Sequence, residues 1–286
     1  MSITPEQIKQ IALDDDDFGH EMRVGDILEN PLASVDARNR EIARIWPPEH
    51  GATYQDPRLG KTRQFDFRCK IDWGAPSHTK RVLLAIECKN LNPEYPLVIC
   101  GRPRTPEESW LIFLNRPENE IAQLGKFEGR SSYYPPDEFV GKNILRIKEK
   151  AGKLCADNDS EIYDKYSQAL ASMHDLAFEA AYTAQGATCT AFFALPLVVV
   201  PDKSLWFLNY NNRGEPNTPA QIDRCAYYVK HKMNLARPDI TLPFVVTHIH
   251  FATCKGLSQI LTEFLIHSES MWDKIAHPRA SVQYRS

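Results

Sequence analysis

Two acidic residues and a lysine stand at the ends of two neighbouring apolar segments. Asp66 belongs to the alternating segment 64–71, and Glu87 and Lys89 close the apolar segment 82–89. In a β-strand, residues i and i+2 point to the same side, so Glu87 and Lys89 share a face. Charges at the end of an apolar strand are costly to bury without a partner. A divalent cation together with a phosphate would supply that partner.

The two segments are expected to pair as an antiparallel hairpin, because the turn-rich segment 72–80 joins them. If Asp66 lies opposite Glu87, every pair on the other face is apolar, as a consistent register requires. Those pairs are Phe67 with Ile86, Cys69 with Leu84 and Ile71 with Val82. Two carboxylates so close repel each other unless a cation lies between them. Hard oxygen ligands with open positions suit Mg²⁺ or Mn²⁺.

The charge distribution adds a possible contact surface for a polyanion. The net charge is −3, but residues 57–104 carry ten Lys or Arg against four acids, which is a net +6. A local basic patch can bind phosphates even on an acidic protein. Arg58, Lys61 and Arg63 are therefore predicted nucleic-acid contacts. The alternative is that these side chains are ordinary solvated charges.

The elements that must position these residues follow from capping signals and apolar spacing. Helices are expected over residues 6–13, 18–29, 36–46, 159–184, 219–234 and 257–267. Strands are expected over residues 64–71, 82–89, 189–200, 204–210 and 242–253. Between them, seven prolines make segment 91–157 irregular, with short strands possible at 97–100 and 110–114. Strands alternating with helices predict an α/β fold, a mixed central β-sheet flanked by helices.

A family resemblance rests on the stretch 54–66 followed by 84–90, which contains Glu87-Cys88-Lys89. This pattern resembles the PD-(D/E)XK nuclease superfamily, which has the restriction-endonuclease-like fold. The tripeptide E-C-K after a hydrophobic strand is frequent in its prokaryotic members. The resemblance implies that Asp66, Glu87 and the backbone carbonyl of Cys88 bind metal. It also implies that Lys89 orients or deprotonates the attacking water, or stabilises charge on the phosphate.

The same resemblance implies two further site residues and a domain organisation. Members often add a glutamate on the first core helix, for which Glu21 is the first choice and Glu41 the reserve. Many carry a glutamine on the helix after the E-x-K strand, and Gln168 matches. The alternative for Glu21 and Gln168 is a solvated helix position. A single domain is expected over 1–286, with a restriction-endonuclease-like core at about 18–90 and 159–267 and an insertion at about 91–157.

The expected function is that of a Mg²⁺-dependent endonuclease that hydrolyses phosphodiester bonds. Family habit favours DNA as the substrate, with a role in restriction, repair or phage defence, in a homo-oligomer or a larger defence complex. The first alternative is a non-catalytic nucleic-acid-binding or assembly module that retains the nuclease fold. The second is an unrelated α/β enzyme in which these charges merely coincide.

The remaining sequence features favour a cytoplasmic protein without a membrane partner. No stretch approaches the roughly 18 uncharged apolar residues that span a bilayer, and residues 1–10 carry no apolar secretory core. The seven cysteines are scattered, without a C-x-x-C pair. His248 and His250 could offer two metal ligands on one strand face, but buried or hydrogen-bonded strand histidines are the expected outcome.

Overall fold

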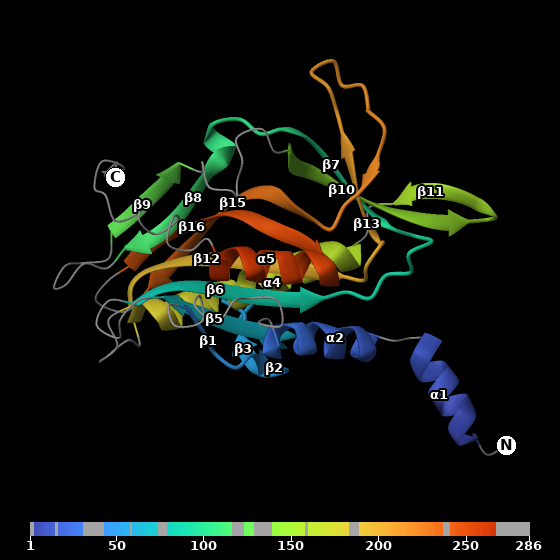
Figure 1. Ribbon diagram of the computed structural model, residues 1–286, viewed down its shortest axis with the longest axis horizontal. Helices are drawn as coiled ribbons and strands as arrows, with labels where there is room; N and C mark the ends of the chain where they lie inside the picture. The colour runs from blue at the N-terminus through green and yellow to red at the C-terminus, as the bar shows by residue number, and fades with distance from the viewer. Residues whose placement is uncertain are drawn as a thin grey trace.

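A computed structural model describes residues 3–14, 17–30, 43–57, 59–73, 79–115, 123–128, 139–157, 160–182, 189–236 and 241–266. These residues form a mixed α/β fold in which a few helices flank a large mixed sheet (Figure 1). The helices are α1 (Pro5–Asp14), α2 (Asp17–Glu29), α4 (Ser160–Tyr182) and α5 (Cys254–Ile266), with a 3₁₀ turn η1 (Glu107–Ser109).

The strands come mostly from three stretches of the chain. The first gives β1 (Ala43–Ile45), β2 (Glu49–His50), β3 (Thr53–Gln55), β4 (Thr62–Gln64), β5 (Phe67–Trp73) and β6 (Thr79–Cys88). The second gives β7 (Leu97–Pro103), β8 (Trp110–Asn115), β9 (Gln123–Glu128), β10 (Phe139–Lys150) and β11 (Lys153–Asp157). The third gives β12 (Cys189–Val200), β13 (Leu205–Asn209), β14 (Ala220–Gln221), β15 (Arg224–Ala236) and β16 (Thr241–Thr253).

The main sheet has the strand order β1-β5-β6-β12-β16-β15-β10-β7-β13-β14. β5 and β6 form an antiparallel hairpin, and β12 returns beside β6 in parallel after α4. A parallel return needs a crossover connection, and α4 is the helix within it. The sequence therefore predicts correctly that, along the chain, a two-stranded hairpin is followed by a long helix and then by the strand that becomes β12.

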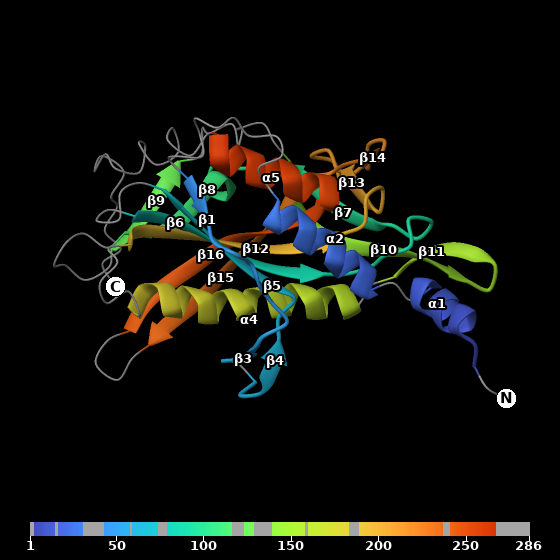
Figure 2. The same ribbon diagram turned by 60° about the horizontal axis from the view of Figure 1, so that its bottom comes forward.

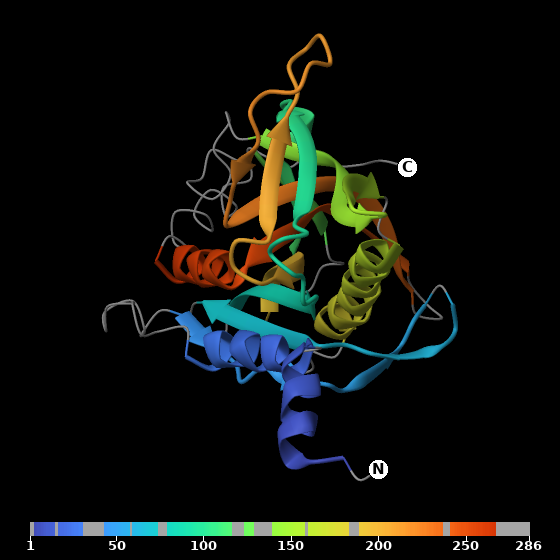
Figure 3. The ribbon, with the colours of Figure 1, turned by 90° about the vertical axis from the view of Figure 1, so that its right-hand side faces the viewer.

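Helices cover both faces of the central strands. Figures 2 and 3 show α4 on one side of β5, β6 and β12, and α2 and α5 on the other. The α2–α5 side buries one face of the hairpin, including Phe67 and Ile86, in a single apolar cluster. The α4 side buries Leu83 and Ala85 against apolar residues of α4. Burial on both faces explains why the segment 82–89 is almost continuously apolar.

The predicted hairpin register is confirmed. Phe67 pairs with Ile86, Cys69 with Leu84 and Ile71 with Val82. The prediction of one continuous strand over 64–71 is wrong. β4 ends at Gln64, β5 begins at Phe67, and Asp66 lies in the bend between them. Phe65 consequently packs with Tyr54 and Ala171 rather than beside Phe67. β4 pairs with β3 in a separate two-stranded hairpin.

Three other sequence predictions need correction. The end of the predicted helix 36–46 is strand β1, which pairs with β5, whereas residues 36–42 lie outside the described part. The predicted helix 219–234 is instead β14 and β15, because β15 pairs along β16 and buries alternate residues near its end. Segment 91–157 is richer in strands than expected, and β7 and β10 join the main sheet. The short strands expected at 97–100 and 110–114 are confirmed as β7 and β8.

Within the described ranges, every helix is too short or too polar to cross a bilayer.

Candidate active site

A line of polar residues on α4 faces the hairpin β5–β6. We call it the α4 polar stripe: Glu161, Lys165, Gln168, Ser172, Asp175 and Glu179. The spacing of three or four residues puts all six on one helix face. Farther along the stripe, Arg68 donates to the Ser172 hydroxyl (3.0 Å) and to Asp175 (2.8 Å), and Lys70 pairs with Glu179 (3.1 Å). These contacts fix α4 in register with the two strands.

The stripe meets the two predicted metal-binding carboxylates through Lys165. The Lys165 Nζ atom lies 2.7 Å from Asp66 Oδ2 and 3.2 Å from Glu87 Oε2. The backbone N–H of Cys88 also donates to Asp66 Oδ2, at 2.6 Å. Glu87 is fully buried, and only 13% of the Asp66 side chain is exposed. We call these two residues the Asp66–Glu87 pair. They converge on one ammonium group, so the structure brings the two carboxyl groups together.

Burial and charge shift the protonation equilibria of this cluster. Burial, with the neighbouring charge of Asp66, raises the pKa of Glu87 to about 8, although Lys165 acts in the opposite direction. Burial alone would lower the pKa of Lys165, but the charges of Glu87 and Asp66 outweigh it and leave that pKa raised. Lys165 is therefore an ammonium held between two carboxyl groups.

One carboxylate oxygen of the pair remains available. Glu87 Oε1 is buried and accepts no hydrogen bond within the described structure. A buried polar atom without a hydrogen-bond partner calls for a physical explanation, and a bound ion is one such explanation. No three His, Cys, Asp or Glu side chains of the described ranges form a ready-made metal site. Mg²⁺ fits the chemistry of the pair nevertheless, because it is usually held by one or two carboxylates and keeps several waters.

Glu21 lies within electrostatic reach of the pair. Burial and the charge of Asp66 raise the pKa of Glu21, while a contact of 3.4 Å with His50 Nε2 lowers it. Glu21 stands one turn before Gly25, where a Cβ would come within 3.3 Å of the Phe67 ring. The missing side chain at Gly25 therefore lets α2 approach β5. The reserve choice, Glu41, lies outside the described part.

Lys89 leaves the strand on the same face as Glu87 but pairs with the first turn of α4. Its Nζ atom lies 3.0 Å from Glu161 Oε2. The exposed fractions are 20% for the Lys89 side chain and 63% for that of Glu161, so the pair is at the rim of the site. The sequence predicts Lys89 beside the two carboxyl groups, whereas in the structure the lysine that contacts them is Lys165.

Gln168 connects the pair to Arg63. With its amide oriented to satisfy its neighbours, Gln168 donates to Glu87 Oε2 and accepts from Arg63, each at 3.1 Å. Arg63 also pairs with Asp56 at 2.9 Å. The predicted residue Gln168 thus lies at the site. The missed residue Lys165 is one turn earlier on the same helix face, and this spacing was the signal that could have identified it.

The predicted nucleic-acid contacts have different surroundings. Lys61 is exposed, Arg63 is partly buried beside Gln168, and Arg58 lies outside the described residues. Other cations of segment 57–104 pair with acids on α4. They include Arg68 with Asp175 and Lys70 with Glu179, whose acids lie outside the segment. The excess of +6 is therefore partly neutralised, and it overstates the charge available to a polyanion.

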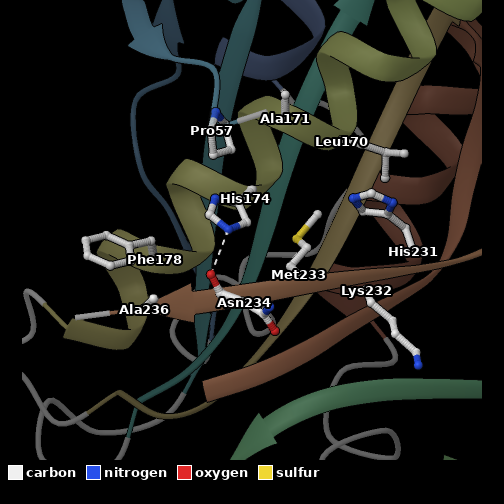
Figure 4. A pocket seen from close by; sticks show the side chains of 10 residues that line it. All are labelled: Pro57, Leu170, Ala171, His174, Phe178, His231, Lys232, Met233, Asn234 and Ala236. Atoms are coloured by element: carbon white, nitrogen blue, oxygen red, sulfur yellow. Dashed lines mark hydrogen bonds between the residues drawn. The ribbon is translucent and has the colours of Figure 1, made fainter. Parts of the chain in front are cut away.

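A cavity and two buried histidines also contain polar groups, but they lie apart from the Asp66–Glu87 pair. A cavity of about 430 Å³ lies between α4 and β15, where His174 Nε2 donates to the Asn234 carbonyl oxygen at 3.1 Å (Figure 4). His248 and His250 are buried, and burial lowers the pKa of both. Burial of both histidines agrees with their expected structural role.

Comparison with known proteins adds no relative: no protein-family model, curated protein or solved structure matches this chain.

Proposed function

We propose that this chain is a metal-dependent nuclease that hydrolyses phosphodiester bonds. The observation that carries the proposal is the convergence of Asp66 and Glu87 on one cation, with Glu87 Oε1 lacking a partner. The bend before β5 and the end of β6 bring two hard oxygen donors together at a buried position, where a cation offsets their repulsion. The resemblance noted in the sequence favours DNA as the substrate and a role in restriction, repair or phage defence.

Asp66 and Glu87 would hold the metal, and the proposal adds the Cys88 carbonyl as a third ligand. A bound Mg²⁺ or Mn²⁺ would polarise the scissile phosphate and lower the pKa of a coordinated water. Lys89 would place a positive charge near the attacking water and the phosphate. Gln168 and Glu21 would orient groups around the pair, and Arg63 and Lys61 would contact the nucleic-acid backbone.

The order of elements supports a restriction-endonuclease-like core. The helix that carries Glu21 precedes the hairpin that carries Asp66 and Glu87. α4, which carries Gln168, follows and leads into the parallel strand β12. This is the order in which the resemblance predicts these residues. The strands β7 and β10 of segment 91–157 extend the same sheet.

A second candidate function is a nucleic-acid-binding module without catalysis. Three ion pairs favour it: Lys165 already compensates both Asp66 and Glu87, and Glu161 already pairs with Lys89. Charged residues that are already paired with one another can stabilise the fold without taking part in catalysis. The two candidates differ in whether added metal produces cleavage.

A substrate panel separates the two candidates. Supercoiled, linear and single-stranded DNA and RNA would be incubated with the protein in Mg²⁺, in Mn²⁺ and in EDTA. The proposal predicts cleavage of at least one substrate with metal and no cleavage in EDTA. Substrate binding without cleavage under any metal condition would favour the non-catalytic module.

A further inference from the structure

Lys165 is the cation that the sequence did not predict at the site. Its ammonium contacts both members of the Asp66–Glu87 pair, and only 24% of its side chain is exposed. We infer that Lys165 is the resident counter-ion of this pair and that a divalent cation must displace it. Lys165 would thereby set the metal affinity of the site. This inference rests on the proposed function.

The competition follows from the position of the contacts. Lys165 Nζ contacts Oδ2 of Asp66 and Oε2 of Glu87, so one oxygen of each carboxyl group is directed toward the same ammonium group. A metal bridging the pair needs the same region, and two positive charges there repel each other. Metal binding must therefore exceed the free energy of the charge-assisted hydrogen bonds that it replaces.

A second acidic residue, Glu161, stands on the same face of α4 as Lys165 and in the structure pairs with Lys89. Glu161 lies four residues earlier on the same face and is 63% exposed. A glutamate four residues before a lysine is a favourable helical pair. The long side chain of Lys165 can therefore leave the pair without becoming a buried unpaired charge. Displacement is then compatible with an intact α4.

Direct metal binding tests the inference without relying on cleavage. Mn²⁺ binding would be measured by electron paramagnetic resonance for the wild type, Lys165→Met, Lys165→Arg and the matched control Lys70→Met. Like Lys165, Lys70 forms an ion pair between β5 or its vicinity and α4, but Lys70 lies on β5 and its partner is Glu179, outside the Asp66–Glu87 pair. Lys165→Met should bind Mn²⁺ roughly 10–100-fold more tightly than the wild type, because a charge-assisted competitor is gone. Lys165→Arg and Lys70→Met should stay close to the wild type.

A second neutral variant and a site control complete the test. Lys165→Gln should behave as Lys165→Met does. If a neutral variant unfolds without metal because its carboxylates are uncompensated, micromolar Mn²⁺ should restore its circular dichroism, and failure to do so would count against the inference. Asp66→Asn reports whether the metal occupies the pair. Binding that depends on Asp66 but is equal or weaker in Lys165→Met overturns the inference and leaves the metal site standing. Absence of binding in all variants overturns both.

Discussion

Lys89 Nζ lies 3.0 Å from Glu161 Oε2, although Lys89 follows Glu87 by only two residues and comes directly after the end of β6. If Lys89 acts on the water or the phosphate, its work is done in the transition state. Lys89→Ala should therefore lower the cleavage rate by about 10²–10³-fold while leaving much of the DNA affinity intact. Single-turnover cleavage and anisotropy binding would be measured side by side.

The control for this prediction is Glu161→Gln. It removes the partner that holds Lys89 but leaves the lysine in place, so cleavage at saturating Mg²⁺, where a change in metal affinity has no effect, should be retained. Glu161 is largely exposed, so the substitution should change stability little. Wild-type cleavage by Lys89→Ala would remove Lys89 from the mechanism.

The buried carboxyl of Glu87 predicts a pH-dependent stability in the metal-free protein. Its pKa is raised from 4.5 to about 8, so the folded protein binds this proton more tightly than the unfolded chain. The resulting stability is present below pH 4.5 and is lost as the pH rises through 8. Thermal unfolding in EDTA should show this loss between pH 5 and 9, and Glu87→Gln should flatten it. An unchanged profile in Glu87→Gln would show that another group titrates.

The contacts of Arg68 with the α4 polar stripe should contribute measurably to the free energy of unfolding. Its guanidinium is buried and donates to the Ser172 hydroxyl, the Ser172 carbonyl and Asp175. Arg68→Met should reduce the free energy of unfolding by about 2 kcal/mol, because buried acceptors lose their donor. Lys148→Met, which breaks a partly exposed pair at 3.9 Å, should cost less than about 0.5 kcal/mol. Urea unfolding would measure both, and equal losses would contradict the role of Arg68.

The segment around Lys61 and Arg63 should contribute to nucleic-acid binding through phosphate contacts. Neutralising Arg58, Lys61 and Arg63 together should weaken binding for all sequences alike. It should also flatten the salt dependence, whose slope is about −0.9 per phosphate contact on duplex DNA. Fluorescence anisotropy over a salt series in Ca²⁺ would measure the slope.

The matched control neutralises three basic residues elsewhere. These are Lys148, Lys150 and Lys153, which lie on β10 and β11. The prediction requires the control to keep the wild-type slope. If instead the β10–β11 variant alone flattens the slope, the polyanion enters over segment 91–157, and the residues around Lys61 are ordinary solvated surface.

The sequence predicts the strands and helices that carry the site better than it predicts the contacts within the site. The proximity of Asp66 and Glu87 follows from a hairpin register in which Phe67, Cys69 and Ile71 face apolar residues. The α4 helix follows from its apolar spacing. By contrast, the sequence does not reveal which lysine reaches the carboxylates, because long side chains on different elements can compete for one position. Lys89 and Lys165 illustrate that competition.

The failures elsewhere have a common cause. Residues 224–236 form β15 because β16 supplies a long partner, and such a partner can override a local preference for helix. Ala43–Ile45 forms β1 because β5 offers a free edge. The bend at Asp66 depends on backbone contacts with Ala52 and Gly51, which are distant enough in sequence to be invisible to local patterns.

Metal-dependent nicking of supercoiled plasmid by the wild type and by Asp66→Asn tests the central claim most directly. Asp175→Asn is the matched control, because Asp175 lies on the α4 polar stripe and pairs with Arg68, outside the Asp66–Glu87 pair. The account predicts nicking by the wild type and by Asp175→Asn in Mg²⁺, none in EDTA, and a loss of at least about 10²-fold in Asp66→Asn. Equal nicking by the wild type and Asp66→Asn, or no nicking by the wild type with any metal, would contradict it.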